Sequence, residues 1–170
     1  MDFEEFVAQR RRPLFRFAVV LCGDPVLAED LLQDVLGRAF ERWHQVGAAD
    51  DVNAYVRRML VNEFLGWRRR LGRTTPVAAM DGLLPDLPDH ADSHCEQAAL
   101  ADELANLPPK QRAVLVLRFY AAMSYAEVAA CLGCRESTAR AHAARALAAL
   151  RIQLATPQVS ATSKPVFEAD

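Results

Sequence analysis

Apolar residues recur at helical spacing in two blocks of this chain, and each block carries recognisable helix signals. In the first block, the pattern over residues 3–21 predicts a helix with a kink at Pro13 and an end at Gly23. Asp24 is a favourable N-cap and Pro25 suits the first helical position, so a second helix is predicted directly afterwards. Its apolar stripe comprises Ala28, Leu31, Leu32, Val35, Leu36, Ala39, Phe40 and Trp43.

A polar loop over residues 47–53 is predicted to follow, and after it a third helix with a basic end. Either Tyr55 or Val56 begins the apolar face of this helix, because the spacing fits both. The rest of that face comprises Met59, Leu60, Phe64 and Trp67. The helix ends in the run Trp67-Arg68-Arg69-Arg70, and residues 1–72 are therefore expected to form one helical domain.

Residues 73–94 are predicted to be a flexible linker, because they contain Pro76, Pro85 and Pro88 and show no helical repeat. Every charged residue from Asp81 to Glu103 is acidic, so the linker is negatively charged. At the other end of the chain, residues 156–170 are polar and contain prolines, and we expect a disordered tail there.

The second block, residues 95–155, is predicted to contain a helix-turn-helix. Ser124 and Glu127 match a capping box, and Gly133 permits a tight turn before a helix over residues 136–150 or beyond. The apolar positions before this motif are Leu100, Leu104, Leu107, Ala113, Val114, Leu117 and Phe119. The predicted fold class is therefore all-α: two small helical domains joined by a flexible acidic linker.

Charge is unevenly distributed along the chain, although the formal net charge is only −2. Arginines cluster in residues 57–73, and basic residues outnumber acidic ones in residues 104–155. No apolar run approaches the length of a transmembrane helix, and Arg16 interrupts the one near the N-terminus. We therefore expect a cytoplasmic protein that contacts no membrane and keeps its cysteines reduced.

The helix predicted over residues 136–150 is the strongest candidate for contact with nucleic acid. The second helix of a helix-turn-helix enters the major groove with its N-terminal end, where an arginine such as Arg140 can bond guanine edges or phosphates. Its outward positions are Glu136, Ser137, Arg140, Ala141 and Arg145. The alternative is an ordinary helical hairpin with a solvated arginine face.

The basic third helix is a second, weaker candidate. Arginines beside Tyr55, Phe64 and Trp67 can hold single-stranded DNA by phosphate contacts and base stacking. Taken alone, however, the pattern favours the alternative that the rings are core and the arginines are merely solvated. The polar face of the second helix, made of Glu29, Asp30, Gln33 and Asp34, is ambiguous in the same way.

Cys131 and Cys134 form a C-x-x-C that His94, Cys95 or His142 could complete as a zinc site. The pair spans the turn of the helix-turn-helix, where a buried cysteine packs as a small apolar residue, so we expect no metal and no cofactor. The chain also lacks a phosphate-cradling glycine loop, an H-E-x-x-H and a G-x-S-x-G. We therefore expect no enzymatic activity.

Taken in order, these segments resemble the extracytoplasmic-function (ECF) sigma factors, group 4 of the sigma-70 family. Residues 28–35 resemble region 2.2, residues 54–70 resemble regions 2.3 and 2.4, and residues 107–112 and 124–129 resemble region 4. The resemblance covers residues 3–151. It implies a subunit that lends promoter recognition to RNA polymerase and contacts the β′ clamp helices, the β flap and promoter DNA. An anti-sigma factor is a further partner that it allows.

The resemblance also implies a role for each motif. Core polymerase would bind Glu29, Asp30, Gln33 and Asp34. The minus-ten promoter element would be melted and read by Asp51, Asn53, Tyr55, Arg57, Arg58, Asn62, Trp67, Arg68 and Arg69. The minus-thirty-five element would be read by Arg135, Glu136, Ser137, Thr138, Arg140, Ala141 and Arg145.

This chain departs from the family at the start of its recognition helix. Arg135 stands where the family usually has a small capping residue, and Glu136 places a negative charge near phosphate, so the usual minus-thirty-five preference does not carry over. Two rival hypotheses remain. One is a stand-alone helix-turn-helix regulator whose first block dimerises or senses a signal; the other, which rests on the cysteines alone, is a zinc-dependent redox or anti-sigma-like protein.

Overall fold

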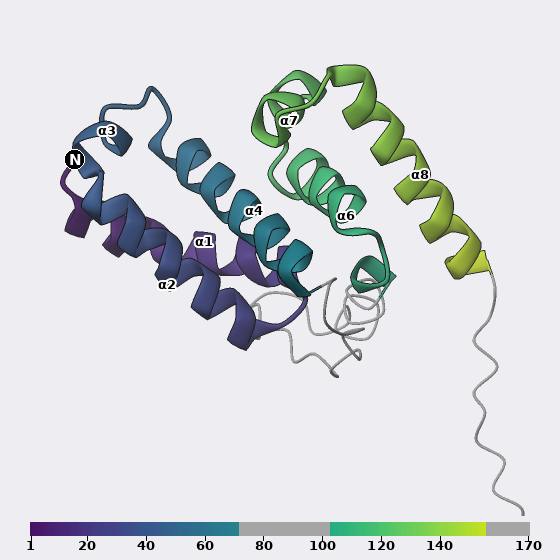
Figure 1. Ribbon diagram of the computed structural model, residues 1–170, viewed down its shortest axis with the longest axis horizontal. Helices are drawn as coiled ribbons and strands as arrows, with labels where there is room; N and C mark the ends of the chain where they lie inside the picture. Colours follow the sequence, from purple (N-terminus) through teal and green to yellow (C-terminus); the bar gives the residue numbers. More distant parts are fainter. Residues whose placement is uncertain (72–102, 156–170) are drawn as a thin grey trace, which may run out of the picture.

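The computed structural model describes residues 1–71 and 103–155, with the side chains of the second range described as far as residue 150. Every regular element in these two ranges is a helix (Figure 1). The first half contains α1 (Phe3–Cys22), α2 (Pro25–Glu41), α3 (Trp43–Val46) and α4 (Val52–Leu71). The second half contains α6 (Pro109–Leu115), the π-helix η1 (Val116–Tyr120), α7 (Tyr125–Leu132) and α8 (Glu136–Ala155).

The corner between α1 and α2 forms as the local signals predict. Gly23 ends α1 in the left-handed region, with φ of 77°, and its N–H donates to the carbonyl of Val19. The Asp24 carboxylate then accepts the backbone N–H groups at the start of α2. Pro13 lies inside α1, which continues through it to Cys22.

The segment between α2 and α4 differs from the prediction. A short helix, α3, interrupts it, and α4 already begins at Val52, so the predicted loop over residues 47–53 is shorter and Asn53 is helical. Asp51 caps α4 by accepting the N–H of Ala54 at 2.9 Å, which explains the early start. Val56 is buried whereas Tyr55 is 43% exposed, which settles the two possible helix faces.

Two aromatic residues predicted to lie on apolar faces are exposed instead. Phe40 is 58% exposed because it lies at the end of α2, where its ring packs against Phe3 rather than into the core. Phe119 is 59% exposed because the chain widens into the π-helix η1, which rotates its last residues outward. Ala122 follows with φ of 55°, an uncommon conformation for a residue with a side chain.

The helix-turn-helix of α7 and α8 forms as predicted. Ser124 and Glu127 make a reciprocal capping box, and Gly133 ends α7 in the left-handed region. α8 is held by a stripe of buried apolar residues at helical spacing, namely Ala139, Ala143, Ala146 and Leu150. It packs on α6 and α7 and lies on the side of the second half that faces away from α1–α4 (Figure 1).

The two halves pack against each other. α6 lies between α8 and α4, α7 also contacts α4, and η1 contacts α1 (Figure 1). Residues 112–117 are all buried, as expected for a helix covered on every side. Buried residues of both halves therefore form one continuous core. We call this packing of α6, η1 and α7 against α1 and α4 the closed arrangement.

The remaining predictions concern residues outside this description. The expected linker over 73–94, including its acidic character, and the expected tail over 156–170 lie outside the described residues, so the domain boundaries stay predictions. Of the helices that the structure describes, none has the length and apolar character needed to cross a bilayer.

Candidate nucleic-acid interface

The polar face of α2 presents its predicted residues together. Asp30, Gln33 and Asp34 are exposed, and Glu29 is half-buried because it accepts hydrogen bonds from Arg11 at 2.6 Å and from Gln33 at 3.2 Å. The Asp34 carboxylate has no hydrogen-bond partner among the described residues; only its backbone carbonyl is used, by Arg38. This face therefore offers an unpaired carboxylate and exposed polar groups to a partner.

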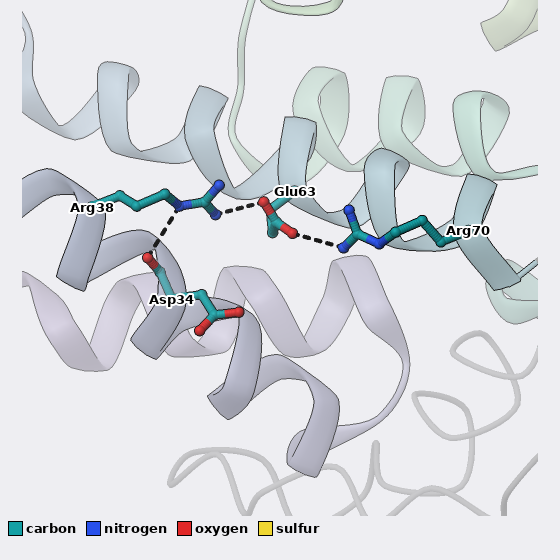
Figure 2. Close-up of polar contacts among 4 residues, drawn as sticks. All are labelled: Asp34, Arg38, Glu63 and Arg70. Carbon is teal, nitrogen blue, oxygen red and sulfur yellow. Dashed lines mark hydrogen bonds and ion pairs between the residues drawn. The ribbon is translucent and has the colours of Figure 1, made fainter.

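A network of ion pairs ties α2 to α4 (Figure 2). The carboxylate of Glu63 on α4 accepts one hydrogen bond from Arg38 of α2 at 2.5 Å and another from Arg70 at 3.0 Å. Burial alone would raise the pKa of Glu63, but the hydrogen bonds from the two arginines outweigh it and hold the pKa below its ordinary value. Glu63 is therefore a carboxylate at neutral pH and fixes both guanidinium groups.

Beside this network lies a surface pocket of about 240 Å³ between the end of α2, α3 and α4. Its lining combines an aromatic ring, a thioether, an amide and two guanidinium groups: Arg38, Arg42, Val46, Tyr55, Met59, Asn62 and Glu63. The volume is below the range of about 300–1,000 Å³ typical of sites for drug-sized ligands. Rings that stack and polar groups that read hydrogen bonds are what an unstacked nucleobase requires.

The structure divides the residues predicted for the minus-ten element. Tyr55 and Asn62 line the pocket. Asp51 caps α4, and Asn53, two positions before Tyr55, is not among the lining residues and has a buried side-chain oxygen with no partner among the described residues. Trp67 packs against the core. Two of these five residues are therefore placed to contact a base in the pocket.

The predicted arginines of α4 lie away from the pocket. The guanidinium of Arg57 lies 5.8 Å from the ring centroid of Phe17 on α1. Arg58 and Arg68 lie toward the second half, where Arg58 is close enough to act on the thiol of Cys131 and Arg68 on the guanidinium of Arg112. Arg69 is exposed. In the closed arrangement, Arg57 and Arg68 are thus half-buried, whereas Arg58 stays exposed.

The start of α8 is an exposed polar surface. Arg135 occupies the N-cap position, where its carbonyl accepts the N–H groups of the next turn, and Ser137 and Thr138 are exposed beside it. Arg140 donates two hydrogen bonds to Glu136, at 2.5 and 3.1 Å, and its guanidinium lies 4.6 Å from the ring centroid of Tyr125.

Further along α8, Ala141 is half-buried and Arg145 is exposed. Burial, Arg145 and Lys110 together lower the pKa of His142, so this histidine is neutral at neutral pH. The basic character around this part of α8 therefore comes from its own Arg145 and from Lys110 of α6.

The cysteines of the described residues are free thiols. Burial raises the pKa of Cys131 to about 11, so its thiol is protonated at neutral pH. No cluster of histidine, cysteine and acidic side chains in residues 1–71 and 103–155 has an arrangement that holds a metal. His94 and Cys95, which the zinc hypothesis also involves, lie outside the described residues.

Sequence reasoning missed most of the pocket. Arg38, Arg42, Val46, Met59 and Glu63 line it but were not predicted as site residues. A partial signal existed, because Tyr55, Met59, Asn62 and Glu63 are spaced so as to share one face of a helix. No pattern in α2 alone indicates that Arg38 and Arg42 meet that face.

Comparison with known proteins gives this arrangement a family. Residues 6–74 match the description "Sigma-70 region 2" and residues 97–150 match "Sigma-70, region 4". The chain is 39% identical to the RNA polymerase sigma-E factor of Streptomyces coelicolor over 95% of its own length and 90% of that protein. It is 31% identical to the ECF RNA polymerase sigma factor SigL of Mycobacterium tuberculosis, over 83% of this chain and 82% of that one. The chain belongs to the ECF sigma factors.

Solved structures agree with this assignment. The sigma factor RpoE of Bartonella quintana, determined in complex with the anti-sigma factor NepR, superposes with a TM-score of 0.75 at 25% identity and covers 92% of this chain and 99% of that one. The predicted family and all-α fold are thereby confirmed. As an ECF sigma factor, the protein is an RNA polymerase subunit that directs transcription initiation and carries a DNA-binding region 4.

Proposed function

We propose that this ECF sigma factor binds core RNA polymerase through the polar face of α2, captures an unstacked minus-ten base in the pocket beside α4, and reads the minus-thirty-five duplex with α8. It does no covalent chemistry of its own, and it acts in the cytoplasm. The observation that carries this proposal is the pocket, because it gives region 2 a preformed site of suitable size and chemistry for one base.

The α2 surface supports the first part of the proposal. Its apolar stripe is used internally, which leaves the exposed Asp30, Gln33 and Asp34 for a partner. A partner whose clamp helices carry basic side chains would pair with these carboxylates. The ion pairs of Glu63 then connect the bound helix α2 directly to α4, so polymerase binding and base capture share one rigid support.

In the pocket, Tyr55 supplies a ring for stacking, and Asn62 supplies an amide that can both donate and accept. Arg38 and Arg42 supply donors, and their charge favours the nearby phosphate backbone. A base enters such a pocket only from a melted strand, so this site supports a role in capturing the opened promoter rather than duplex DNA.

The closed arrangement is not the promoter-bound one. The minus-ten and minus-thirty-five elements lie roughly 25 base pairs apart, about 85 Å at about 3.4 Å per pair. A compact chain of this size is only about 40 Å across. We therefore infer that polymerase binding separates the two halves, and that the isolated chain binds promoter DNA poorly.

A protein partner of the anti-sigma class is a further part of the proposal. The support is the likeness to RpoE of Bartonella quintana, which was determined with its anti-sigma factor NepR. That likeness extends over both halves of the chain.

Run-off transcription with core polymerase on fragmented genomic DNA tests the whole proposal. We expect initiation at a discrete set of promoters only when the sigma factor is added, and no sequence-specific gel shift by the sigma factor alone. A tight, specific shift without polymerase would contradict the proposal and favour a stand-alone regulator.

The α2 interface has a sharper test. Asp34→Arg places a positive charge where a carboxylate has no partner within the described residues, so core affinity should fall by tenfold or more while helicity is unchanged. Glu4→Arg, the same charge change at an exposed position on α1, is the matched control and should bind normally. Equal core affinities of the two variants would show that α2 is not the interface.

A further inference from the structure

Arg112, in the last turn of α6, is the one charged side chain among the described residues that is buried, with only 4% of its surface exposed. It reaches across from the second half to the first. Its Nη2 donates a hydrogen bond of 3.0 Å to the carbonyl of Val20, a residue 92 positions earlier in the chain. No carboxylate is paired with it in the described part of the chain, and neither the polymerase-binding face nor the base pocket includes it.

The guanidinium of Arg112 lies at the C-terminal end of α1. The last carbonyls of a helix lack intrahelical donors and carry partial negative charge. α1 has no basic residue in its own last turn, and the carbonyl of Val20 takes its donor from the other half. Arg112 thus supplies both the hydrogen-bond donor and the cation that this helix end lacks.

Gly23 completes the socket. A Cβ at position 23 would lie 2.7 Å from Nη2 and 3.3 Å from Nη1 of Arg112, so a side chain there would displace the guanidinium. Gly133 adopts the same left-handed conformation at the end of α7, but a Cβ there would meet nothing within 4 Å. The close approach of Arg112 is therefore particular to the α1 end.

We propose that Arg112, seated in the socket formed by Val20 and Gly23, is a latch that holds the two halves in the closed arrangement and that polymerase binding releases. This rests on the proposed function, in which the halves must separate. In the closed arrangement, Arg68 of α4 is half-buried and lies toward Arg112 of α6, so the latch also partly covers basic surface proposed for promoter contact, whereas Arg58 stays exposed.

The latch is weak enough to open. The Nε of Arg112 has no partner among the described residues, and Arg68 repels its charge from nearby. Burial, aided by Arg68, lowers the pKa of Arg112 to about 10, which leaves it charged at neutral pH but poorly solvated. On opening, the guanidinium and the Val20 carbonyl both return to water. Removing the donor alone leaves a partly buried carbonyl unpaired, so a variant without it favours the open form.

Small-angle X-ray scattering of the isolated full chain tests this, because it needs neither polymerase nor DNA. Arg112→Met keeps the length of the side chain but removes the donor, and Gly23→Ala fills the socket. Each should raise the radius of gyration above that of the parent, and the double variant should add nothing further, because both break one contact. Arg112→Lys, which keeps the charge but not the fork of donors, should open the chain partially.

Gly133→Ala is the matched control: it introduces the same left-handed strain in open space and should leave the chain compact. Circular dichroism confirms that each variant remains helical. A chain that stays compact with Arg112→Met, or that opens as far with Gly133→Ala as with Gly23→Ala, would overturn the latch. Either result leaves the sigma factor assignment intact. The proposed function fails separately, if the parent chain is compact in scattering but supports no initiation when it is added to core polymerase.

Discussion

Two helices, α4 and α8, carry the residues proposed to contact DNA, and they hold their polar side chains in different ways. On α4, Glu63 is bonded across to Arg38 of α2, and its side chain is only 15% exposed. On α8, Arg140 is paired with Glu136 of the same helix, and the two side chains are 60% and 46% exposed. Pairing across helices encloses a pocket, whereas pairing within one helix leaves an open surface. The first arrangement suits a single captured base, and the second suits a duplex groove.

The largest effect should come from removing the ring of the pocket. Tyr55→Ala should cost about 1–3 kcal/mol of base capture, because stacking on one aromatic ring contributes that much. We expect a loss of roughly ten- to a hundredfold in open-complex formation, measured with a fluorescent base at the minus-ten element. Tyr55→Phe keeps the ring and should retain most of the activity. An equal loss in both variants would mean that the ring does not stack.

On α8, truncation should change selectivity at the other promoter element. Arg140→Ala should reduce initiation by about tenfold and relax preference at one minus-thirty-five position, since it removes a base-edge donor near the helix start. Arg145, five residues further on, is offset by about 140° and should instead weaken binding to all sequences alike. Transcription from a library with randomised promoters separates the two outcomes. If Arg140→Ala shifts minus-ten preference, the division between the helices is wrong.

Removing an ion-pair carboxylate should have a smaller effect, on the free energy of unfolding, and this effect should be larger on α4 than on α8. Glu63→Gln should lower the free energy of unfolding by about 1 kcal/mol, a figure discounted because Arg38 and Arg70 are largely exposed. Glu136→Gln, the control on α8, should cost at most a few tenths. Urea titrations of both variants measure the two losses in the free energy of unfolding. Similar losses would show that pairing across helices stabilises the fold no more than pairing within one helix.

The Glu63 contribution should also depend on pH. Its pKa is lowered in the folded protein, so its stabilising effect is complete above the ordinary carboxyl pKa of about 4.3 and disappears as the pH falls through the lowered value. The stability gap between the parent and Glu63→Gln should therefore close in acid.

The smallest effect is expected at the cysteines. Burial raises the pKa of Cys22 to about 12 and that of Cys131 to about 11, so both thiols are protonated and should alkylate slowly. Among the three cysteines that the structure describes, the half-exposed Cys134 should react first, as mapped by mass spectrometry. A chelator or a reductant should change neither the melting temperature nor transcription. Stoichiometric zinc in the purified protein would contradict this.

Local signals predict the ends of the helices well. Gly23, Asp24 and Ser124 each act through their own conformation or a neighbouring N–H, so a few residues contain the whole cause. The family of the chain is recognisable for the same reason, because its motifs are short and appear in order. The fold class and the helix ends set by these caps therefore follow from the amino-acid sequence alone, whereas α3 and the early start of α4 were not predicted.

Features that join distant segments are not accessible in this way. The pocket requires α2, α3 and α4 to converge. The sequence gives no reason to expect Arg112 to be buried, because its burial depends on contact with α1. The unbroken apolar run from Ala113 to Leu117 was an overlooked signal, because a helix without a polar face needs cover on all sides. The π-helix has no comparable signature; its register depends on the tertiary packing around it.

The complete burial of residues 112–117, at the end of α6 and the start of η1, has a consequence for engineering. Hybrid sigma factors, built by joining region 2 of one protein to region 4 of another, treat the two regions as interchangeable modules. A hybrid that takes α6 from this chain would also have to keep the residues of α1 and α4 that cover it. Gly23 is one of the residues to keep. A hybrid lacking them would expose apolar surface before it meets polymerase, and aggregation rather than altered promoter choice would limit its use.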